Sequence, residues 1–413
     1  MSSLRSGSIG LFLMLLAGCT QPQTTSHQIS QPVSVSQKSV TDSGLSDAHA
    51  TAETRALYVH LQNIKKHHTL FGQQDALAYG FKWNGNDDAN NSRADVKDVT
   101  GSFPAIVGWD LGGLELNNEK NLDGVSMKKM RTEIQAVYKR GGINTISWHM
   151  RNPVSGGDPA DETPAVKEVL PGGSKHELFK TRLDALATFN ENLKVGDTYI
   201  PIIFRPWHEH NGEWFWWGKG NASEQDYIEL WRFTINYLRN GKNVHNFIFA
   251  ISPDRSRINL ENFEQDYLYA YPGNDYVDIM GLDNYWDLGH PANKASAPEQ
   301  LENFSQSLTK VATIANEHQK LAALTETGSE AIPNPNFWTQ VLLKGLLAND
   351  QSRQTVYVMV WRNATNGGFN GHHFYTPYVG HSSAEDFIKF KQGDFVVFED
   401  ELPVNYKNIN ARR

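Results

Sequence analysis

Eight short, mostly apolar runs recur along the chain and constrain its fold more than any other feature. We expect each to be a buried β-strand, over residues 70–74, 105–109, 143–148, 199–204, 247–251, 277–282, 321–325 and 356–361. Strands that are apolar throughout are typical of a parallel sheet that is covered on both faces. Eight strands in series, separated by helical patterns, therefore predict an α/β fold with one (β/α)8 TIM-type barrel rather than an open doubly wound sheet.

Amphipathic patterns place helices between these strands. The clearest pattern has apolar residues three or four positions apart, at Leu301, Phe304, Leu308, Val311 and Ala315. A second begins at Met127. A third includes Phe179, and we expect the capping box Ser174-x-x-Glu177 to introduce it.

The first residues have the pattern of an export signal. A basic start at Arg5 precedes an apolar run, 9–17, that is too short to span a bilayer. Residues 1–18 are therefore expected to be a signal peptide. Its end, Leu16-Ala-Gly-Cys19, resembles the bacterial lipobox, in which Cys19 becomes the lipidated first residue of an exported lipoprotein. Thr20, rather than Asp, follows the cysteine, and this resembles the pattern of lipoproteins that are sorted to the outer membrane or cell surface.

The next residues separate this terminus from the folded part. Residues 20–46 are rich in Gln, Ser and Thr without apolar periodicity, so we expect 19–46 to be the lipidated cysteine and a flexible tether. No second linker of this kind follows, which predicts one domain over 47–413. The net charge of −8 argues against nucleic acid or an anionic membrane surface as the main partner.

Polar and aromatic residues follow most of the predicted strands directly. In a barrel, the active site lies at the carboxyl ends of the strands, so these residues are the first candidates. They are Gln74-Asp75, Trp109-Asp110, Trp148-His149, Arg205 with His208-Glu209-His210, Asp283 with Tyr285-Trp286, Glu326 and Trp361.

Two of these residues, Glu209 and Glu326, follow strands four and seven and can face each other across the barrel mouth. Paired carboxyl groups are what glycoside hydrolysis needs: one protonates the leaving oxygen, and the other attacks the anomeric carbon or activates water. Such pairs also serve as metal ligands or as ordinary loop charges, so the pair alone leaves these alternatives open.

The longest motif strengthens the first alternative. Arg205-Pro-Trp-His-Glu-His-Asn-Gly-Glu-Trp-Phe-Trp-Trp-Gly218 resembles the signature of glycoside hydrolase family 26, whose best-known members are β-mannanases. Further similar motifs occur in order over residues 71–361, including Phe71-Gly-Gln-Gln-Asp75 and Thr325-Glu-Thr-Gly328. The resemblance implies a retaining (β/α)8 enzyme that uses no cofactor, with Glu209 as acid/base and Glu326 as nucleophile.

The remaining candidates are expected to bind or orient the sugar. We expect a raised pKa for Glu209, whereas Glu326 should stay ionised with Tyr285 as donor and Arg205 as cation. Arg205 pairing with a core aspartate is the other possibility. The expected substrate-binding residues are His149, Arg205, His208, Trp214, Tyr285, Trp361, Trp109, Asp110 and Asp283.

Three features have weaker alternatives. His208 and His210, with Glu209 between them, could hold a metal ion, but the two histidines lack a third ligand at a recognisable spacing, so we expect no metal. Trp216 and Trp217 are wall or core residues. His372-His373 is expected in a surface loop.

The expected substrates are β-1,4-linked mannans, galactomannans and manno-oligosaccharides, cleaved by a monomer. Family 26 enzymes that act on mixed-linkage β-1,3-1,4-glucan or on β-1,3-xylan remain alternatives, as does a non-catalytic sugar-binding lipoprotein. The excursion after Asp110, over residues 111–121, could wall off the groove if Leu114 or Leu116 packs beside Trp109. That would confine cleavage to chain ends and release mannobiose.

Overall fold

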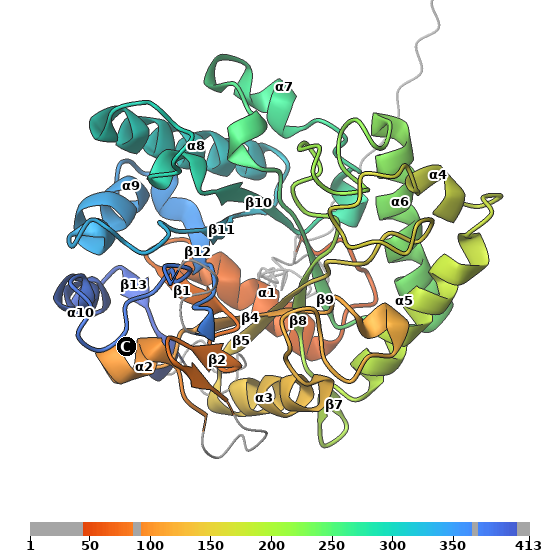
Figure 1. Ribbon diagram of the computed structural model, residues 1–413, viewed down its shortest axis with the longest axis horizontal. Helices are drawn as coiled ribbons and strands as arrows, with labels where there is room; N and C mark the ends of the chain where they lie inside the picture. The colour runs from red at the N-terminus through yellow and green to blue at the C-terminus, as the bar shows by residue number, and fades with distance from the viewer. Residues whose placement is uncertain (1–43, 86–91, 366–370, 403–413) are drawn as a thin grey trace, which may run out of the picture. The chain divides into compact units, whose positions relative to one another are not determined.

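The computed structural model describes residues 44–85, 92–365 and 371–402, all within one compact unit, Thr41–Arg413. Its centre is a closed barrel of eight parallel strands (Figure 1). In barrel order the strands are β1 (Thr69–Gln74), β4 (Ile106–Asp110), β5 (Ile143–Ser147), β8 (Ile202–Arg205), β9 (Phe247–Ile251), β10 (Ile279–Asn284), β11 (Leu321–Thr327) and β12 (Thr355–Val360). Pairing of β12 with β1 closes the ring, and this confirms the predicted closed barrel.

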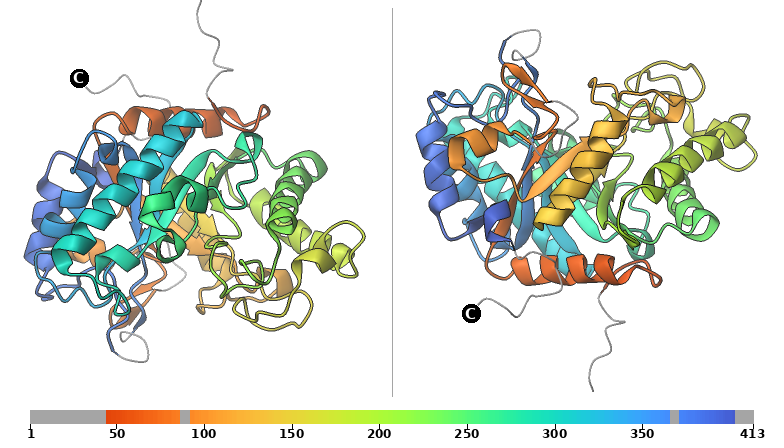
Figure 2. Two further views of the ribbon diagram at one scale, coloured as in Figure 1. Left: turned by 90° about the horizontal axis from the view of Figure 1, so that it is seen from above. Right: turned by 90° about the horizontal axis from the view of Figure 1, so that it is seen from below.

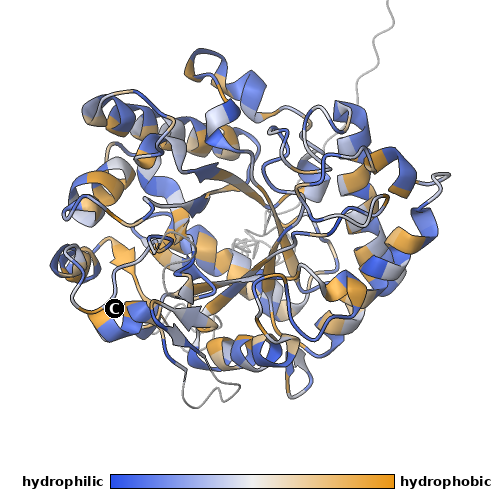
Figure 3. Cartoon of the chain, viewed as in Figure 1, coloured by the Kyte–Doolittle hydropathy of each residue, from blue (hydrophilic) through white to orange (hydrophobic). Residues whose placement is uncertain are grey.

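Helices surround the barrel between successive strands. They are α2 (Asp95–Thr100), α3 (Met127–Arg140), α4 (Val166–Val169), α5 (His176–Glu191), α6 (Glu224–Asn236), α7 (Phe263–Tyr267), α8 (Ala297–Glu317), α9 (Leu343–Leu346) and α10 (Ala384–Gln392). Figure 3 shows hydrophobic and hydrophilic residues on each of the larger helices, as expected for helices that pack against a sheet on one side.

An apolar layer fills the barrel. Inside it, Ile106, Ile203 and Ile248 belong to one buried cluster. The α1 helix (Ala52–Ile64) adds Leu57 and Leu61 to this cluster and lies across one end of the barrel (Figure 2). This leaves the opposite end, where the strands finish, for the residues with candidate functions.

Short elements complete the described fold. Parallel β13 (Val396–Val397) extends the sheet beside β1, and two hairpins pair β2 (Tyr79–Gly80) with β3 (Trp83–Asn84) and β6 (Lys194–Val195) with β7 (Thr198–Tyr199). The predicted fourth strand is therefore too long, because Tyr199 belongs to the second hairpin and β8 begins only at Ile202.

The predicted capping box before α5 is wrong. The helix begins at His176, its N-cap residue is Lys175, and no side chain caps it. Ser174 donates its hydroxyl to Glu168 Oε2 instead. At the other end of the domain, Ser46, which we assigned to the tether, donates its backbone N–H to Asp278 Oδ1 at 2.6 Å. Ser46 therefore already contacts the barrel and does not belong to the tether.

Candidate active site

The turn after β8 presents Glu209 through a strained backbone. Trp207 and Glu209 have φ angles of 51° and 54°, in the left-handed region that side chains other than glycine rarely occupy. Two contacts hold the turn: Glu209 N–H donates to Ser252 O at 2.7 Å, and Tyr227 donates its hydroxyl to Trp207 O at 2.8 Å. The strained residues are therefore those that set the orientation of the Glu209 carboxyl group.

Glu209 lies in surroundings that favour its protonated form. Trp214 Nε1 donates to its Oε2 at 2.7 Å. Burial raises the pKa of Glu209 well above its usual value, and the charges of Asp254, Asp283 and Glu326 raise it further. We expected a raised pKa for Glu209. The two aspartates were not foreseen. A carboxyl group that keeps its proton at neutral pH can act as a general acid.

Glu326, in β11, has the opposite surroundings. Tyr285 donates its hydroxyl to Oε1 at 2.8 Å, and Arg205 Nη2 donates to Oε2. The side chain is buried, so a cation and a hydroxyl donor face an otherwise desolvated carboxylate. Both partners stabilise negative charge, which suits a nucleophile.

Arg205 and Asp283 support this carboxylate from below. Arg205 Nη1 donates to Asp283 Oδ2 at 2.7 Å, and Thr325 donates its hydroxyl to Asp283 Oδ1 at 2.7 Å. Arg205 is 1% exposed and Asp283 is 0% exposed, so neither side chain reaches the mouth. We expected both to bind substrate; the structure instead places them beneath Glu326. The sequence had left open whether Arg205 pairs with Glu326 or with a core aspartate, and it pairs with both.

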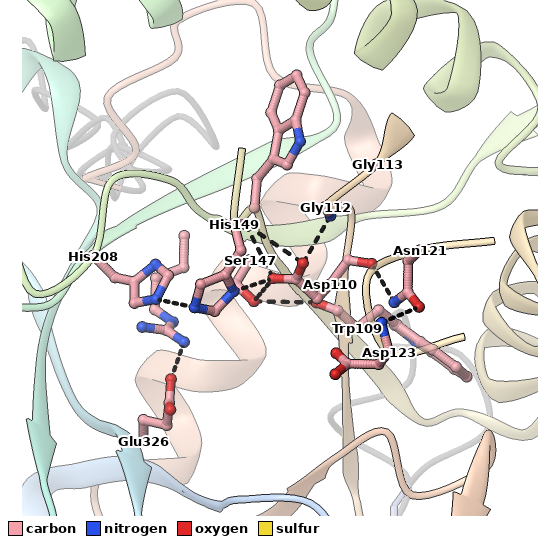
Figure 4. Close-up of polar contacts among 12 residues, drawn as sticks. Trp109, Asp110, Gly112, Gly113, Asn121, Asp123, Ser147, His149, His208 and Glu326 are labelled. Carbon is pink, nitrogen blue, oxygen red and sulfur yellow. Dashed lines mark hydrogen bonds and ion pairs between the residues drawn. The ribbon is translucent and has the colours of Figure 1, made fainter. Parts of the chain in front are cut away.

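A chain of three side chains, Asp110, His149 and His208, comes from the ends of β4, β5 and β8 (Figure 4). His149 Nδ1 donates to Asp110 Oδ2 at 2.7 Å, and His149 Nε2 lies 3.1 Å from His208 Nε2. Burial lowers the pKa of His149, but the charge and hydrogen bond of Asp110 and the charges of Glu326 and Asp123 raise it, and the net shift is upward. Burial, Arg205 and His149 together lower the pKa of His208 well below 6.5. Of the two imidazoles, His149 therefore carries a proton more readily than His208.

Asp110 acts through His149 rather than at the surface of the site. It is 1% exposed, and Gly112 N–H and Ser147 Oγ also donate to its carboxylate. These donors and His149 lower its pKa although burial alone would raise it. The predicted contact between Asp110 and sugar is therefore replaced by an orienting role.

Three predicted aromatic residues line the mouth. Trp214, Tyr285 and Trp361 surround a cavity of about 960 Å³, together with Glu326. Trp109 is the exception, because its ring is fully buried and Nε1 donates to Asn144 Oδ1 at 3.0 Å. In β4, Asp110 faces the mouth, so the preceding side chain faces the surrounding helices. The predicted contact of Trp109 with substrate is therefore wrong.

Residues with alternative interpretations also have defined places. Trp216 and Trp217 are fully buried core residues. His210 turns away from His208 and lies 2.8 Å from Tyr269 O through Nε2, so the two imidazoles do not converge. Within the described ranges, no group of three or more His, Cys, Asp or Glu side chains could hold a metal ion. His373 pairs with Glu330 in an exposed segment.

Asp254 was missed as a residue of the site, and Trp286 was named at a strand end without an assigned role. Asp254 and Trp286 line the same cavity as Glu326. Asp254 follows the apolar run of β9 as Ser-Pro-Asp, so the strand-end rule that identified the other candidates would have found it. The fifth predicted strand was the one for which no strand-end residue was considered.

Comparisons with known proteins agree with this arrangement. The family model described as glycosyl hydrolase family 26 matches residues 46–366. A mannan endo-1,4-β-mannosidase of Bifidobacterium adolescentis is 36% identical over 382 residues, which cover 89% of this chain but 36% of that protein. The chain thus spans about a third of that relative's length. A second one, from Bacillus subtilis, is 28% identical over 67% of this chain and 70% of its own length.

Solved structures are similar over nearly their whole length. A family 26 β-mannanase from Bacteroides ovatus is 38% identical, with a TM-score of 0.78 over 88% of this chain and 99% of that chain. A family 26 protein from Muricauda sp. is 33% identical, with a TM-score of 0.78 over 89% of this chain and 96% of its own.

Proposed function

Because the chain belongs to glycosyl hydrolase family 26, we propose that it is a retaining glycoside hydrolase that cleaves β-1,4-mannosidic linkages. The observation that carries this proposal is the contrast between two glutamates at the barrel mouth. Glu209 is buried beside other carboxylates, whereas Glu326 accepts hydrogen bonds from Arg205 and Tyr285. Double displacement at an anomeric carbon requires one carboxyl group that donates a proton and a second that attacks as the nucleophile.

The chemistry follows from these two environments. Glu326 attacks the anomeric carbon as Glu209 gives its proton to the departing glycosidic oxygen, which leaves a glycosyl-enzyme ester. Glu209, now ionised, removes a proton from water, which attacks the same carbon and releases Glu326. His149 lies beside this centre and is partly exposed, so it can bind a sugar hydroxyl, whereas His208 is 1% exposed and contacts His149.

The substrate class rests on the relatives. Those from Bifidobacterium adolescentis and Bacillus subtilis are both named mannan endo-1,4-β-mannosidases. We therefore propose mannans, galactomannans and manno-oligosaccharides as substrates. A β-glucan substrate is the second candidate, because an endoglucanase H of Acetivibrio thermocellus is 35% identical over 162 residues.

An assay of reducing ends separates the candidates. We expect the purified protein to release reducing ends from locust-bean galactomannan far faster than from barley β-1,3-1,4-glucan or β-1,3-xylan. Faster release from glucan or xylan would replace the proposed substrate. A protein that binds manno-oligosaccharides but releases nothing from any of the three would be a sugar-binding protein.

We also propose a preference for chain ends, with mannobiose as the main product. Leu114 is buried and Leu116 is 46% exposed, and Trp109 lies in the core, so the apolar wall that we expected at these residues does not form there. Just beyond this excursion, Asp123 forms an ion pair with Arg362, which follows β12. This contact joins the loops that follow β4 and β12, the two strands that flank β1, and it is our support for a groove that is closed on that side.

Viscosity distinguishes the two modes of cleavage. An enzyme confined to chain ends shortens galactomannan slowly, so viscosity should fall little while reducing ends accumulate. A rapid loss of viscosity at a low degree of hydrolysis would show an open groove and ordinary internal cleavage.

We further propose that the protein is an exported lipoprotein, attached through Cys19 and working as a monomer. Residues 1–43, which include the predicted signal peptide and most of the tether, lie outside the described residues. Among those described, no helix combines the length and apolarity needed to cross a membrane. Replacing Cys19 by Ser should move the protein from the membrane fraction to the soluble fraction. Unchanged membrane association of this variant would rule out the lipobox.

A further inference from the structure

Asp254 lies next to the acid/base in the fold and has no assigned role. It follows β9, and Asn211, which follows Glu209 by two residues, binds it on both sides: Asp254 N–H donates to Asn211 Oδ1 at 2.7 Å, and Asn211 Nδ2 donates to Asp254 O at 2.8 Å. Glu209 N–H donates to Ser252 O in the same segment. The backbone of Asp254 is therefore fixed to the turn that presents Glu209.

The side chain of Asp254 is buried but not fully used. It is 9% exposed and lines the same cavity as Trp214 and Glu326. Its Oδ1 accepts hydrogen bonds from Ser256 N–H at 2.7 Å and from Ser256 Oγ. Its Oδ2 has no partner among the residues that the structure describes. The Oδ1 atom of this carboxyl group is thus fixed by Ser256, and the Oδ2 atom remains available at the cavity wall.

The two carboxyl groups differ in how well each can carry a negative charge. Asp254 has two donors from Ser256, and Arg257 and His290 also lower its pKa, although burial raises it overall. Glu209 has one donor, Trp214 Nε1. When two buried carboxyl groups compete for one proton, it stays on the group whose charge is less well stabilised. Here that group is Glu209.

We propose that Asp254 is a positioning residue for the acid/base: it holds the negative charge of a coupled carboxyl pair, so that the proton stays on Glu209 until the leaving oxygen takes it. This inference rests on the proposed function, because it assumes that Glu209 is the acid. After the proton has left, both groups are ionised, and their repulsion favours the return of a proton from water to Glu209.

Other charges around the pair determine what a test can isolate. The titratable and charged groups that face Glu209 come from the ends of four strands and are Arg205, His208, Asp254, Arg257, Asp283, Tyr285 and Glu326, with His149 behind His208. Among the charges that raise the pKa of Glu209, the charge of Asp254 has the largest effect. Asp283 and Glu326 are both bound by Arg205, whereas Asp254 can be neutralised without disturbing that pair.

The test is the pH profile of kcat/KM for mannotetraose in Asp254→Asn. The high-pH limb reports loss of the proton from Glu209, so we expect it to move down by about one unit, the effect of removing one nearby like charge. For 2,4-dinitrophenyl β-mannobioside, whose leaving group needs no acid, kcat/KM should stay within about threefold of the wild type. A merely structural role would lower both rates without moving the limb.

Two variants control this experiment. Glu213→Gln removes another carboxylate near Trp214, one that is exposed and paired with Arg257, and its limb should not move. If Asp254→Asn does not fold, Ser256→Ala removes one donor from Asp254, so Asp254 takes a larger share of the proton: kcat/KM for mannotetraose should fall, while that for the dinitrophenyl substrate should not. An unmoved limb in the folded Asp254→Asn protein, or an equal shift in Glu213→Gln, would overturn the proposal. Full activity of Glu209→Ala on mannotetraose would instead overturn the proposed function itself.

Discussion

Replacing Glu326 by Ala should leave a folded protein whose hydrolysis of mannan is lower by several orders of magnitude. Nucleophilic and acid/base steps each commonly contribute a factor of about 10² or more, and no other carboxylate is bound by both Arg205 and Tyr285 in the described structure. Arg205 keeps its hydrogen bonds to Asp283 and Ser252 in this variant, so the buried cation stays paired. Folding should therefore survive.

The measurement is the rate of release of reducing ends beside the thermal unfolding temperature. Glu326→Gln is the matched control for shape, because it keeps the size of the side chain but cannot act as a nucleophile, and it should be equally inactive. Binding of manno-oligosaccharides should persist in both variants. A Glu326→Ala protein that retains a tenth of the wild-type activity would contradict the assignment of Glu326 as the nucleophile.

Glu209→Ala should fail in a different way. Mannan hydrolysis should again fall by a factor of about 10² or more, because departure of a sugar alkoxide needs an acid. With 2,4-dinitrophenyl β-mannobioside, formation of the glycosyl-enzyme should continue, and its hydrolysis should become rate-limiting because the base is missing. A burst of dinitrophenolate followed by a slow steady state is the expected trace.

The contrast between substrates is the evidence for the division of roles. Added azide should speed the slow phase, because it attacks the glycosyl-enzyme without a general base. Equal losses on mannan and on the activated substrate, with no burst, would contradict the role of Glu209.

The fold was largely predictable because a strand buried on both faces leaves a continuous apolar run. All eight predicted barrel strands are present, and α3 and α8 occupy the segments whose apolar spacing predicted them. The errors lie at the ends of elements. The start of α5 and the start of β8 depend on which of several possible local hydrogen bonds form, and tertiary packing rather than local sequence determines which of them form.

The candidate site was predictable as a set of strand ends but not as a set of contacts. The rule that polar residues after strands reach the mouth correctly brought together Glu209, Glu326, His149 and His208. It could not tell which way a side chain faces near the end of a strand. Trp109 is the example, because a difference of one residue places a side chain on the other face of the sheet. It also could not show that Arg205 is covered by Glu326.

The anomeric form of the first product tests the central claim most directly. If Glu326 is a nucleophile and Glu209 an acid and then a base, two inversions at the anomeric carbon retain its configuration. Proton NMR of fresh hydrolysate from reduced manno-oligosaccharides should therefore show the β-anomer first, followed by slow mutarotation to the equilibrium mixture. Initial appearance of the α-anomer would contradict the account, because it would require an inverting water between the two carboxyl groups.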